Sequence, residues 1–513
     1  MHKQVDVLVV GGGINGAGIA RDAAGRGLSV LMCEKDDLAS HTSSASTKLI
    51  HGGLRYLEYY EFGLVRKALQ EREVLLAAAP HIISPLRFVM PHVEQLRPAW
   101  MIRLGLFLYD NLSRRKILFG SRGINFKSHV SGEPLQDRFS KGFVYSDAWV
   151  DDARLVVLNA LDASELGATI LTRSRLVSVK PDPDGAGWLA EIAAHRNGQD
   201  GATITVAARS IVNATGPWVS SFLANQVQPA MAKAHHAIRL VQGSHIVTNK
   251  LFDHHYAYIF QNPDQRIIFA IPYMDQYTLI GTTDSEYSGD PDQVHISESE
   301  IAYLCDSINS YFKKSISPND VIWSFSGVRP LVGDEASDNP SAVTRDYQLE
   351  LDTADGAPML SVFGGKITTF RRLAEQAVDK LAPLLGNQKP SWTAKVPLPG
   401  GDIPRANFDA FLIQFQHRHP WLLSGLAIRY AQQYGQRVSV LLQDARSMGD
   451  LGAELSPGLY ELEARYLGRV EWARSADDIL WRRTKLGLAA SPATRQRLEE
   501  WLALPDNQPE TLR

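Results

Sequence analysis

The stretch VDVLVVGGGINGAGIARDAAGRGLSVLMCE, residues 5–34, decides the fold of this chain. Its start is rich in valine, which is typical of a strand buried on both faces of a parallel sheet. Three glycines then match the spacing G-x-G-x-x-G: Gly11, Gly13 and Gly16. Residues 14–27 are typical of a helix with small side chains, and residues 28–33 of a second strand that leads to Glu34. Strand, glycine turn, helix, strand and acid in this order predict a dinucleotide-binding unit.

Each glycine of the motif has a physical role. Gly11 permits the tight turn, Gly13 lets the backbone approach a pyrophosphate, and Gly16 lets the helix lie close to the strand. The helix N-terminus offers N–H groups and the positive end of a dipole to the phosphates. Glu34 is placed to accept hydrogen bonds from ribose hydroxyls. The motif alone does not separate FAD from NAD.

Composition narrows the classes of function. The chain has 513 residues and a formal net charge of -3, which argues against nucleic acid as the main partner. Its two cysteines, Cys33 and Cys305, give neither a disulfide framework nor a zinc pattern and suit a reducing compartment. We expect no export signal and no spanning helix, because no signal-peptide pattern and no run of about 18 apolar residues is present. A peripheral membrane role stays open.

The strand–helix alternation expected of an NAD-binding domain stops after Glu34. Residues 40–48, SHTSSASTK, form a hydroxyl-rich loop. The strand–helix pattern resumes in residues 202–220, which contain the motif NATGPW near their end. It resumes again in residues 360–381. There a strand is followed by Gly364-Gly365 and a helix from about Thr368, a second glycine turn placed to face the pyrimidine end of a flavin. A nucleotide domain built from three separate parts predicts a flavoprotein with an inserted substrate domain.

The predicted fold class is α/β with an added all-helical domain. The Rossmann-like FAD-binding domain is expected to be discontinuous, from residues 1–80, 145–235 and 340–386. Residues 81–144 and 236–339 are expected to form the substrate domain, where strand-like runs predict an antiparallel sheet. Residues 387–404 are rich in Pro and Gly and predict a linker. Apolar spacings of three and four predict a C-terminal helical domain over residues 405–513.

At this level the chain resembles the FAD-dependent sn-glycerol-3-phosphate dehydrogenases of the aerobic, membrane-associated type. Matching segments extend over nearly the whole chain: VVGGGINGAGIARDAAGRG (9–27), SSASTKLIHGGLRYLE (43–58), YSDAWVDDARLV (145–156), NATGPWV (213–219), GSHIV (243–247), IGTTDSEY (280–287), SGVRPL (326–331), FGGKITTFRRLAE (363–375) and ADDILWRRTKLGL (476–488). One departure is Phe370, where the family usually has tyrosine, which removes a hydroxyl but no charge.

The resemblance implies oxidation of sn-glycerol 3-phosphate to dihydroxyacetone phosphate, with a hydride passing from C2 to flavin N5. Electrons would continue to ubiquinone or another membrane quinone. The protein would be cytoplasmic and peripherally associated with the inner face of the cytoplasmic membrane; a homodimer is left open. A glycerol-3-phosphate oxidase that uses oxygen remains the alternative. An NAD-dependent dehydrogenase and a non-catalytic flavin sensor rank below it.

The expected site needs cations for a phosphate and groups for the cofactor. Arginine's fork suits phosphate oxygens. By resemblance, Arg55 and Arg329 would hold the substrate phosphate, and Lys366 would lie near the substrate or the flavin pyrimidine edge, where its charge stabilises reduced flavin. Lys48 is interpreted as solvated. The residues expected to bind FAD are Gly11, Gly13, Ile14, Asn15, Gly16, Glu34, Ser43, Ser44, Ser46, Thr47, Ala214, Thr215, Gly216, Gly364, Gly365, Lys366 and Thr368.

Oxidation of a secondary alcohol also needs a base for the hydroxyl proton, a task suited to histidine. His51 in LIHGG and His245 in GSHIV lie in matching segments, and with Lys366 they form the expected catalytic set. His51 is preferred because its segment is tied to the cofactor. No metal site is expected, because the neighbouring pairs His235-His236 and His254-His255 would point to opposite faces of a strand and lack a completing cluster.

The segment 96–116 has the sequence LRPAWMIRLGLFLYDNLSRRK. It mixes apolar side chains with flanking cations. Two interpretations stay open for this segment. It is either an interfacial helix that touches anionic lipid or a core helix with a basic end.

Overall fold

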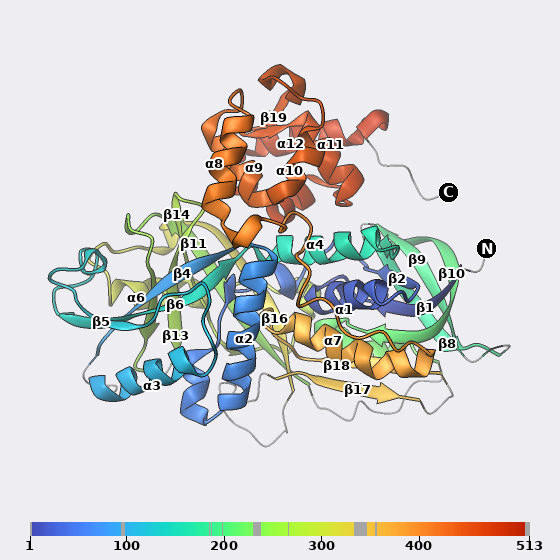
Figure 1. Cartoon of the computed structure of the whole chain (residues 1–513), viewed down its shortest axis with the longest axis horizontal. Helices are drawn as coiled ribbons and strands as arrows, with labels where there is room; N and C mark the ends of the chain where they lie inside the picture. The colour runs from blue at the N-terminus through green and yellow to red at the C-terminus, as the bar shows by residue number, and fades with distance from the viewer. Residues whose placement is uncertain are drawn as a thin grey trace.

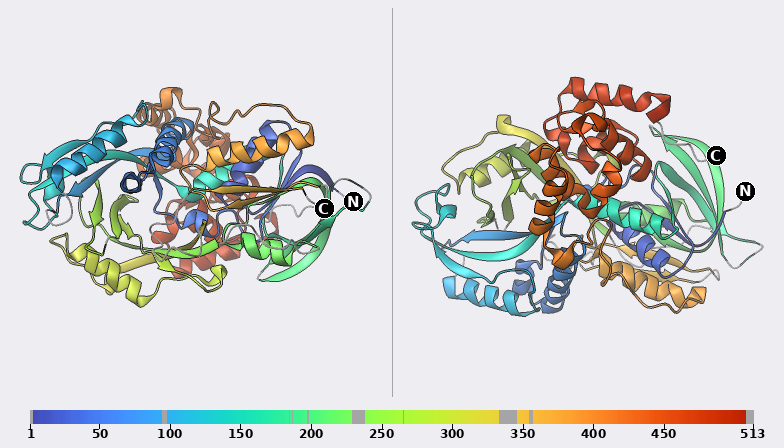
Figure 2. Two further views of the ribbon diagram at one scale, coloured as in Figure 1. Left: turned by 90° about the horizontal axis from the view of Figure 1, so that it is seen from below. Right: turned by 45° about the horizontal axis from the view of Figure 1, so that its top comes forward.

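The computed structural model describes residues 3–93, 98–183, 185, 187–196, 198–228, 238–264, 266–332, 346–353 and 357–507. Figure 1 shows three parts: a first sheet with helices α1, α4 and α7, a second sheet beside it, and a group of C-terminal helices above both. The turned views in Figure 2 show the C-terminal helices, drawn in orange to red, over the junction of the two sheets.

The glycine-rich stretch folds as predicted, into β1 (Lys3–Val10), α1 (Ile14–Gly25) and β2 (Val30–Cys33). The first sheet has the strand order β17-β18-β10-β1-β2-β7, and β18, β10, β1, β2 and β7 run parallel. Its other strands are β7 (Thr169–Leu171), β8 (Ser174–Pro181), β9 (Trp188–Arg196), β10 (Gln199–Asn213), β17 (Gln348–Asp352) and β18 (Met359–Phe363). Strands from the first, middle and late parts of the chain therefore share one sheet, as predicted.

Strand β1 is buried on both faces, which explains its valines. Val7 and Val9 pack toward α1, α4 (Asp152–Glu165) and α7 (Phe370–Leu381). Leu8 and Val10 pack on the opposite face, where β8, β9 and α5 (Val219–Asn225) close the core. Both faces of the sheet are thus covered. The carboxyl end of β1 is left open, and ligands bind at this end of the strands in such sheets.

The second sheet has the order β15-β11-β14-β13-β12-β4-β6-β3, with β16 paired to β11 and β5 to β6. All its pairings are antiparallel except β12 with β4, in agreement with the predicted antiparallel sheet. Its strands are β3 (Leu49–Ile50), β4 (Ile83–Pro91), β5 (Arg122–Asn125), β6 (Lys141–Val150), β11 (Ile238–Asn249), β12 (Ala257–Gln261), β13 (Ile267–Tyr273), β14 (Tyr277–Gly281), β15 (Ser285–Glu286) and β16 (Val321–Val332).

Two features of this sheet cross the predicted domain boundaries. The boundary at residue 145 falls inside β6, and β3 belongs to the segment 1–80 although it pairs with β6. Strand β6 pairs with β4 and β5 of the second sheet along its whole length, so the second sheet takes all of residues 141–150. Helices α2 (Phe62–Ala78), α3 (Ala99–Asn111) and α6 (Glu298–Asn309) accompany it.

The C-terminal part is mainly helical, as predicted, and has a hydrophobic core of its own. It also contains a small hairpin and a π-helical turn, η11 (Asp478–Arg483), which the apolar spacing did not predict. Its regular elements are α8 (Phe408–Arg418), α9 (Ser424–Tyr434), α10 (Val438–Leu442), β19 (Glu454–Ser456), β20 (Leu459–Tyr460), α11 (Glu461–Val470) and α12 (Pro492–Ala503).

Buried ion pairs fasten the C-terminal part to the first sheet. Arg483 lies 2.8 Å from Asp37 in the loop that follows β2, and Arg482 lies 2.7 Å from the same carboxylate. Arg173 in turn reaches Asp478 at 2.6 Å. Because breaking a buried pair leaves a charge without compensation, such contacts fix the relative position of the two parts.

Candidate active site

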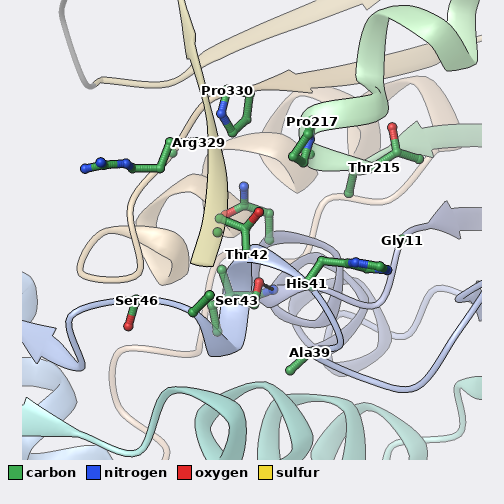
Figure 3. A pocket seen from close by; sticks show the side chains of 18 of the residues that line it. Gly11, Ala39, His41, Thr42, Ser43, Ser46, Thr215, Pro217, Arg329 and Pro330 are labelled. Carbon is green, nitrogen blue, oxygen red and sulfur yellow. Dashed lines mark hydrogen bonds between the residues drawn. The ribbon is translucent and has the colours of Figure 1, made fainter. Parts of the chain in front are cut away.

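A cavity of about 520 Å³ lies at the carboxyl ends of β1, β2 and β10, and residues of the second sheet complete its wall. Figure 3 shows residues that line it, with Arg329 and Pro330 of β16, Pro217 and Thr215 in the upper half of the view and Thr42 and Ser43 of the loop after β2 below them. One continuous cavity therefore contains the glycine turn together with Arg329 and Lys366, two of the three expected substrate cations.

The glycine turn leaves no room for a side chain at Gly11 or Gly16. Gly11 has φ +111°, and a Cβ there would lie 2.5 Å from the carbonyl oxygen of Ala214. A Cβ on Gly16 would lie 1.9 Å from the carbonyl oxygen of Gly11, so helix and turn touch. Gly13 lines the cavity at the start of α1, where no side chain of its own caps the helix. This is the cradle that a pyrophosphate needs.

Glu34 stands at the end of β2 on the cavity wall. Its two carboxylate oxygens accept the N–H groups of Gly12, at 2.6 Å, and of Asp36, at 2.9 Å. Burial raises the pKa of this carboxyl. Glu34, Asp36 and His41 lie close enough together to suggest a cation site. Because backbone N–H groups already occupy both oxygens of Glu34, the geometry fits a ribose contact better than a metal.

The hydroxyl-rich loop divides into residues that face the cavity and one that does not. Ser43, Ser46 and Thr47 line it, whereas the hydroxyl of Ser44 donates to the His41 carbonyl at 3.3 Å and lies outside the lining. The Ser43 hydroxyl accepts the N–H of Ile14 at 3.0 Å, which ties the loop to the start of α1.

Lys48 is not solvated. Its side chain is fully buried, and Nζ donates to Asp152 at 2.8 Å and to the carbonyl of Ser44 at 2.9 Å. The interpretation from sequence failed because the partner carboxylate lies about a hundred positions away at the start of α4, so no local pattern announces it.

The two glycine turns meet at the cavity. Gly364 and Gly365 have φ +73° and +111°, and the Asn15 amide donates to the Gly364 carbonyl at 3.2 Å. The Thr368 hydroxyl accepts the N–H of His51 at 3.2 Å. The remaining expected cofactor residues that line the cavity are Gly13, Ile14, Ala214, Thr215, Gly216 and Lys366.

Of the three expected substrate cations, two line the cavity in the structure and one does not. Arg329 lines the cavity, and its guanidinium donates to Asp284 at 3.0 Å and to the Thr283 carbonyl at 3.2 Å. A Cβ on Gly243 would lie 2.6 Å from this guanidinium, so the glycine makes room for it. Lys366 also lines the cavity, with Nζ 3.8 Å from the ring centroid of Tyr56.

Arg55 lies outside the cavity lining, and its guanidinium instead donates to the Tyr59 hydroxyl at 3.3 Å. Its neighbour Tyr56 takes the place at the wall, because residues 54–59 form a 3-10 turn that the sequence did not reveal. Other lining residues that sequence reasoning missed are His41, Thr42, Pro217, Trp218, Phe269 and Thr282. Thr42 and the GPW motif lie in segments that the sequence already marked as cofactor-facing. No sequence pattern marked Phe269.

Both candidate histidines line the cavity, in different environments. His245 is 2% exposed, its Nε2 lies 3.0 Å from the Thr47 hydroxyl, and its ring stacks on Phe325 with centroids 4.8 Å apart. Burial, with help from the charges of Lys48 and Arg329, lowers the pKa of His245 well below its ordinary value. This shift keeps the imidazole in its neutral form near pH 7. His254, from the second histidine pair, is hydrogen-bonded to the hydroxyl of Tyr258. The first pair, His235 and His236, lies outside the described residues.

Comparison with protein families supports this reading of the chain. Residues 6–370 match the family described as FAD dependent oxidoreductase, and residues 391–506 match the C-terminal domain of alpha-glycerophosphate oxidase. A glycerol-3-phosphate dehydrogenase of Pseudomonas aeruginosa is 55% identical over 97% of this chain and 94% of its own length. A D-erythritol 1-phosphate dehydrogenase of Brucella abortus is 51% identical over 97% of both chains.

A solved structure resembles the whole molecule. It is a glycerol-3-phosphate dehydrogenase from Bacillus halodurans complexed with FAD, with a TM-score of 0.75 and 26% identity. The similarity covers 98% of this chain and 94% of the other. The predicted fold class is thereby confirmed.

Gly13→Ala tests the glycine cradle without breaking the fold. A Cβ there meets only the Ser43 hydroxyl, at 3.0 Å, but projects where a pyrophosphate would bind. We expect FAD affinity to fall at least about tenfold, equivalent to about 1.4 kcal/mol. The measurement is a titration of the apoprotein with FAD. Gly105→Ala in α3, where a Cβ meets nothing within 4 Å, is the control and should keep full affinity. Equal affinity of the Gly13 variant and wild type would contradict the cradle.

Proposed function

Because the chain belongs to the family of FAD-dependent glycerol-3-phosphate dehydrogenases, we propose that it oxidises the C2 hydroxyl of sn-glycerol 3-phosphate to the ketone of dihydroxyacetone phosphate. Family membership confirms the resemblance, the FAD cofactor and the flavin-dehydrogenase class predicted from the sequence. The observation that carries the proposal for this chain is a single cavity whose wall contains the dinucleotide cradle together with Arg329, Lys366 and His245.

The residues present fit FAD. The turn at Gly11–Gly16 and the start of α1 suit its pyrophosphate, Glu34 suits the ribose, and the turn at Gly364–Lys366 suits the pyrimidine end. When bound, FAD supplies the atom N5 that accepts a hydride from the substrate. The chain's own residues must then bind the phosphate, orient C2 and take the hydroxyl proton.

Arg329 and Lys366 supply the positive charge for the phosphate. Asp284 accepts a hydrogen bond from one nitrogen of the Arg329 guanidinium and so fixes the direction of the fork. A fork held in place loses less freedom when it binds a phosphate, which favours affinity and orientation together. Arg55 stays a prediction as a phosphate ligand.

His245 is the better candidate for the base, although the sequence favoured His51. Its imidazole is buried and neutral, and Thr47 fixes Nε2 at the cavity wall. A neutral imidazole there takes the hydroxyl proton as the hydride leaves C2, so no charge is stranded on the substrate oxygen. Lys366 adds a positive charge to the same space, which favours the alkoxide character that develops during the reaction.

The relative named for erythritol phosphate supports a second candidate substrate. D-Erythritol 1-phosphate and glycerol 3-phosphate are both polyols with a terminal phosphate, so the same cations serve either. The ratio of kcat/KM for the two substrates decides between them, and we expect glycerol 3-phosphate to be preferred.

Helix α3 offers a surface for a membrane and thus for a quinone. Only Leu106 and Tyr109 of this helix are buried, which rules out the interpretation as a core helix. Its exposed apolar residues are Trp100, Met101, Leu104 and Phe107, and Phe119 lies 75% exposed a few residues beyond the helix. Arg103, Arg114, Arg115 and Lys116 add positive charge in the same segment. Apolar side chains among cations suit an anionic lipid surface.

The same helix touches the active site from its buried side. The Tyr109 hydroxyl accepts the N–H of Gly52, next to His51, at 2.8 Å. A quinone held in the lipid beside α3 would therefore approach the cavity closely. Peripheral association with the inner face of the cytoplasmic membrane and electron transfer to quinone rather than oxygen are parts of this proposal. No helix among the described residues is long and apolar enough to cross a membrane.

Arg329→Ala should lower kcat/KM for glycerol 3-phosphate about ten- to a hundredfold, because a charge-assisted hydrogen bond to phosphate contributes about 1.5–3 kcal/mol. FAD content should stay unchanged. Arg266→Ala, on the surface of the second sheet, is the matched control. Unchanged turnover of the Arg329 variant at low substrate would refute the phosphate assignment.

The pH dependence of flavin reduction distinguishes the two histidines. The lowered pKa of His245 keeps it neutral as pH falls, so the anaerobic reduction rate at saturating substrate should stay level from about pH 8 to about pH 5.5. A base with the ordinary pKa of about 6.5 would retain only about a tenth of its neutral form at the lower limit. His245→Gln should slow reduction about a hundredfold or more. A loss centred near pH 6.5 that disappears in His51→Gln would assign the base to His51.

A double variant tests the α3 surface. Leu104→Ser with Phe107→Ser should reduce binding to vesicles that contain anionic lipid and quinone by about tenfold or more, because two large apolar side chains no longer enter the interface. Activity with a water-soluble electron acceptor should not change. The control replaces Ile413 and Leu423, which are even more exposed and lie in the C-terminal part, by serine. Equal vesicle binding of the two double variants would exclude α3 as the contact.

A further inference from the structure

We propose that the C-terminal domain positions the imidazole of His245 through a column of aromatic rings that runs from Trp481 through Trp323 to Phe325. The inference rests on the proposed role of His245 as the base. It gives the C-terminal domain a part in the reaction, although most of its residues lie outside the cavity lining.

The column begins on neighbouring strands of the second sheet. His245 on β11 stands directly opposite Phe325 on β16, and their rings stack at 4.8 Å with an interplanar angle of 14°. Trp323 lies two positions before Phe325, hence on the same face of β16, with ring centroids 4.8 Å apart. One face of this strand pair therefore presents three adjoining rings, the first of them in the cavity.

The fourth ring comes from the C-terminal domain. Trp481 of the π-helical turn η11 stacks on Trp323 with centroids 4.5 Å apart and an angle of 20°. Trp323 and Phe325 are only partly buried, so the second sheet does not enclose them by itself. The indole of Trp481 closes the outer end of the column, and π-helical turns are frequent at functional sites.

Trp481 is itself held firmly. The two residues that follow it, Arg482 and Arg483, pair with Asp37 in the first domain. A Cβ on Gly487 would lie 2.5 Å from the indole, so the backbone at Gly487 packs closely against the ring. The outer ring of the column is thus fixed relative to the loop after β2, which carries the cofactor-facing residues.

His245 needs such support because hydrogen bonds alone do not fix its plane. Nε2 has one partner, the Thr47 hydroxyl, and Nδ1 is buried without a hydrogen-bond partner among the described residues. A histidine that acts in a reaction is usually oriented by a bond at its second nitrogen. Here the stacked Phe325 ring orients the imidazole instead. Stacking constrains the plane of the imidazole only while the Phe325 ring itself stays in place.

The charged groups around the column are consistent with a neutral imidazole. Lys48 Nζ lies 4.8 Å from the centroid of the Phe325 ring and pairs with Asp152, and Arg329 approaches from β16. Lys485, just after η11, lies 3.3 Å from Asp151. Both lysines have a carboxylate partner, so loss of an aromatic ring leaves the local charge unchanged.

The test uses FAD-loaded Trp481→Leu and Trp481→Phe, with Trp421→Leu as a control that removes a partly buried tryptophan elsewhere in the same domain. Trp481→Leu should slow anaerobic flavin reduction about tenfold at saturating substrate. Its substrate dissociation constant and FAD content should stay unchanged. Trp481→Phe restores a ring and should recover most of the rate, and Trp421→Leu should match wild type. Diethyl pyrocarbonate should modify His245 faster in Trp481→Leu than in wild type, as read by peptide mass spectrometry.

A double-variant comparison separates positioning from general destabilisation. In a His245→Gln background, Trp481→Leu should not lower the flavin reduction rate further, because the imidazole that Trp481 positions is absent. An equal loss in both backgrounds, or a wild-type rate and labelling in Trp481→Leu, would overturn the column. If Trp481→Leu fails to fold, Trp323→Leu takes its place with the same expected results. A wild-type rate in His245→Gln alone would instead show that the proposed base is wrong.

Discussion

The site depends on one close approach, between strand β16 of the second sheet and the hydroxyl-rich loop that follows β2. The Thr42 hydroxyl donates to the Val328 carbonyl at 2.7 Å, and a Cβ on Gly327 would lie 2.8 Å from the Cβ of Ala45. Because β16 carries Arg329 and the loop reaches the glycine turn through Ser43, this contact sets the distance between the phosphate cation and the cofactor cradle. In the proposed function, a substrate held by Arg329 would thereby be presented to a flavin bound at the glycine turn.

Electrostatics inside the cavity follow from which charges are paired. Lys48 pairs with Asp152 and Arg329 pairs with Asp284, and Arg329 and Lys366 are the two expected substrate cations that line the cavity. Burial, together with the charges of Lys48 and Arg329, lowers the pKa of His245 well below its ordinary value. Arg329, the cation proposed to bind the phosphate, is thus also one of the charges that keep the proposed base unprotonated.

The sequence predicted those parts of the fold and site that depend on local spacing. The turn at Gly11–Gly16 and the second turn at Gly364 are encoded within a few residues, and their strands and helices formed where expected. Long-range pairing was not readable: Lys48 finds Asp152 only after folding, β6 crosses the expected boundary at residue 145, and a 3-10 turn brings Tyr56 rather than Arg55 to the wall. Trp481 reaches the second sheet from the far end of the chain, so its partner could not be inferred from its own segment.

The central claim is that fixed cations and a neutral histidine hold a phosphorylated alcohol against bound FAD. Anaerobic addition of sn-glycerol 3-phosphate to pure, FAD-replete protein tests it most directly, with the visible absorbance of the oxidised flavin as the signal. The account predicts that the absorbance bleaches as the substrate is added and returns when a quinone is supplied. Protein that keeps its full colour under saturating substrate would contradict the account.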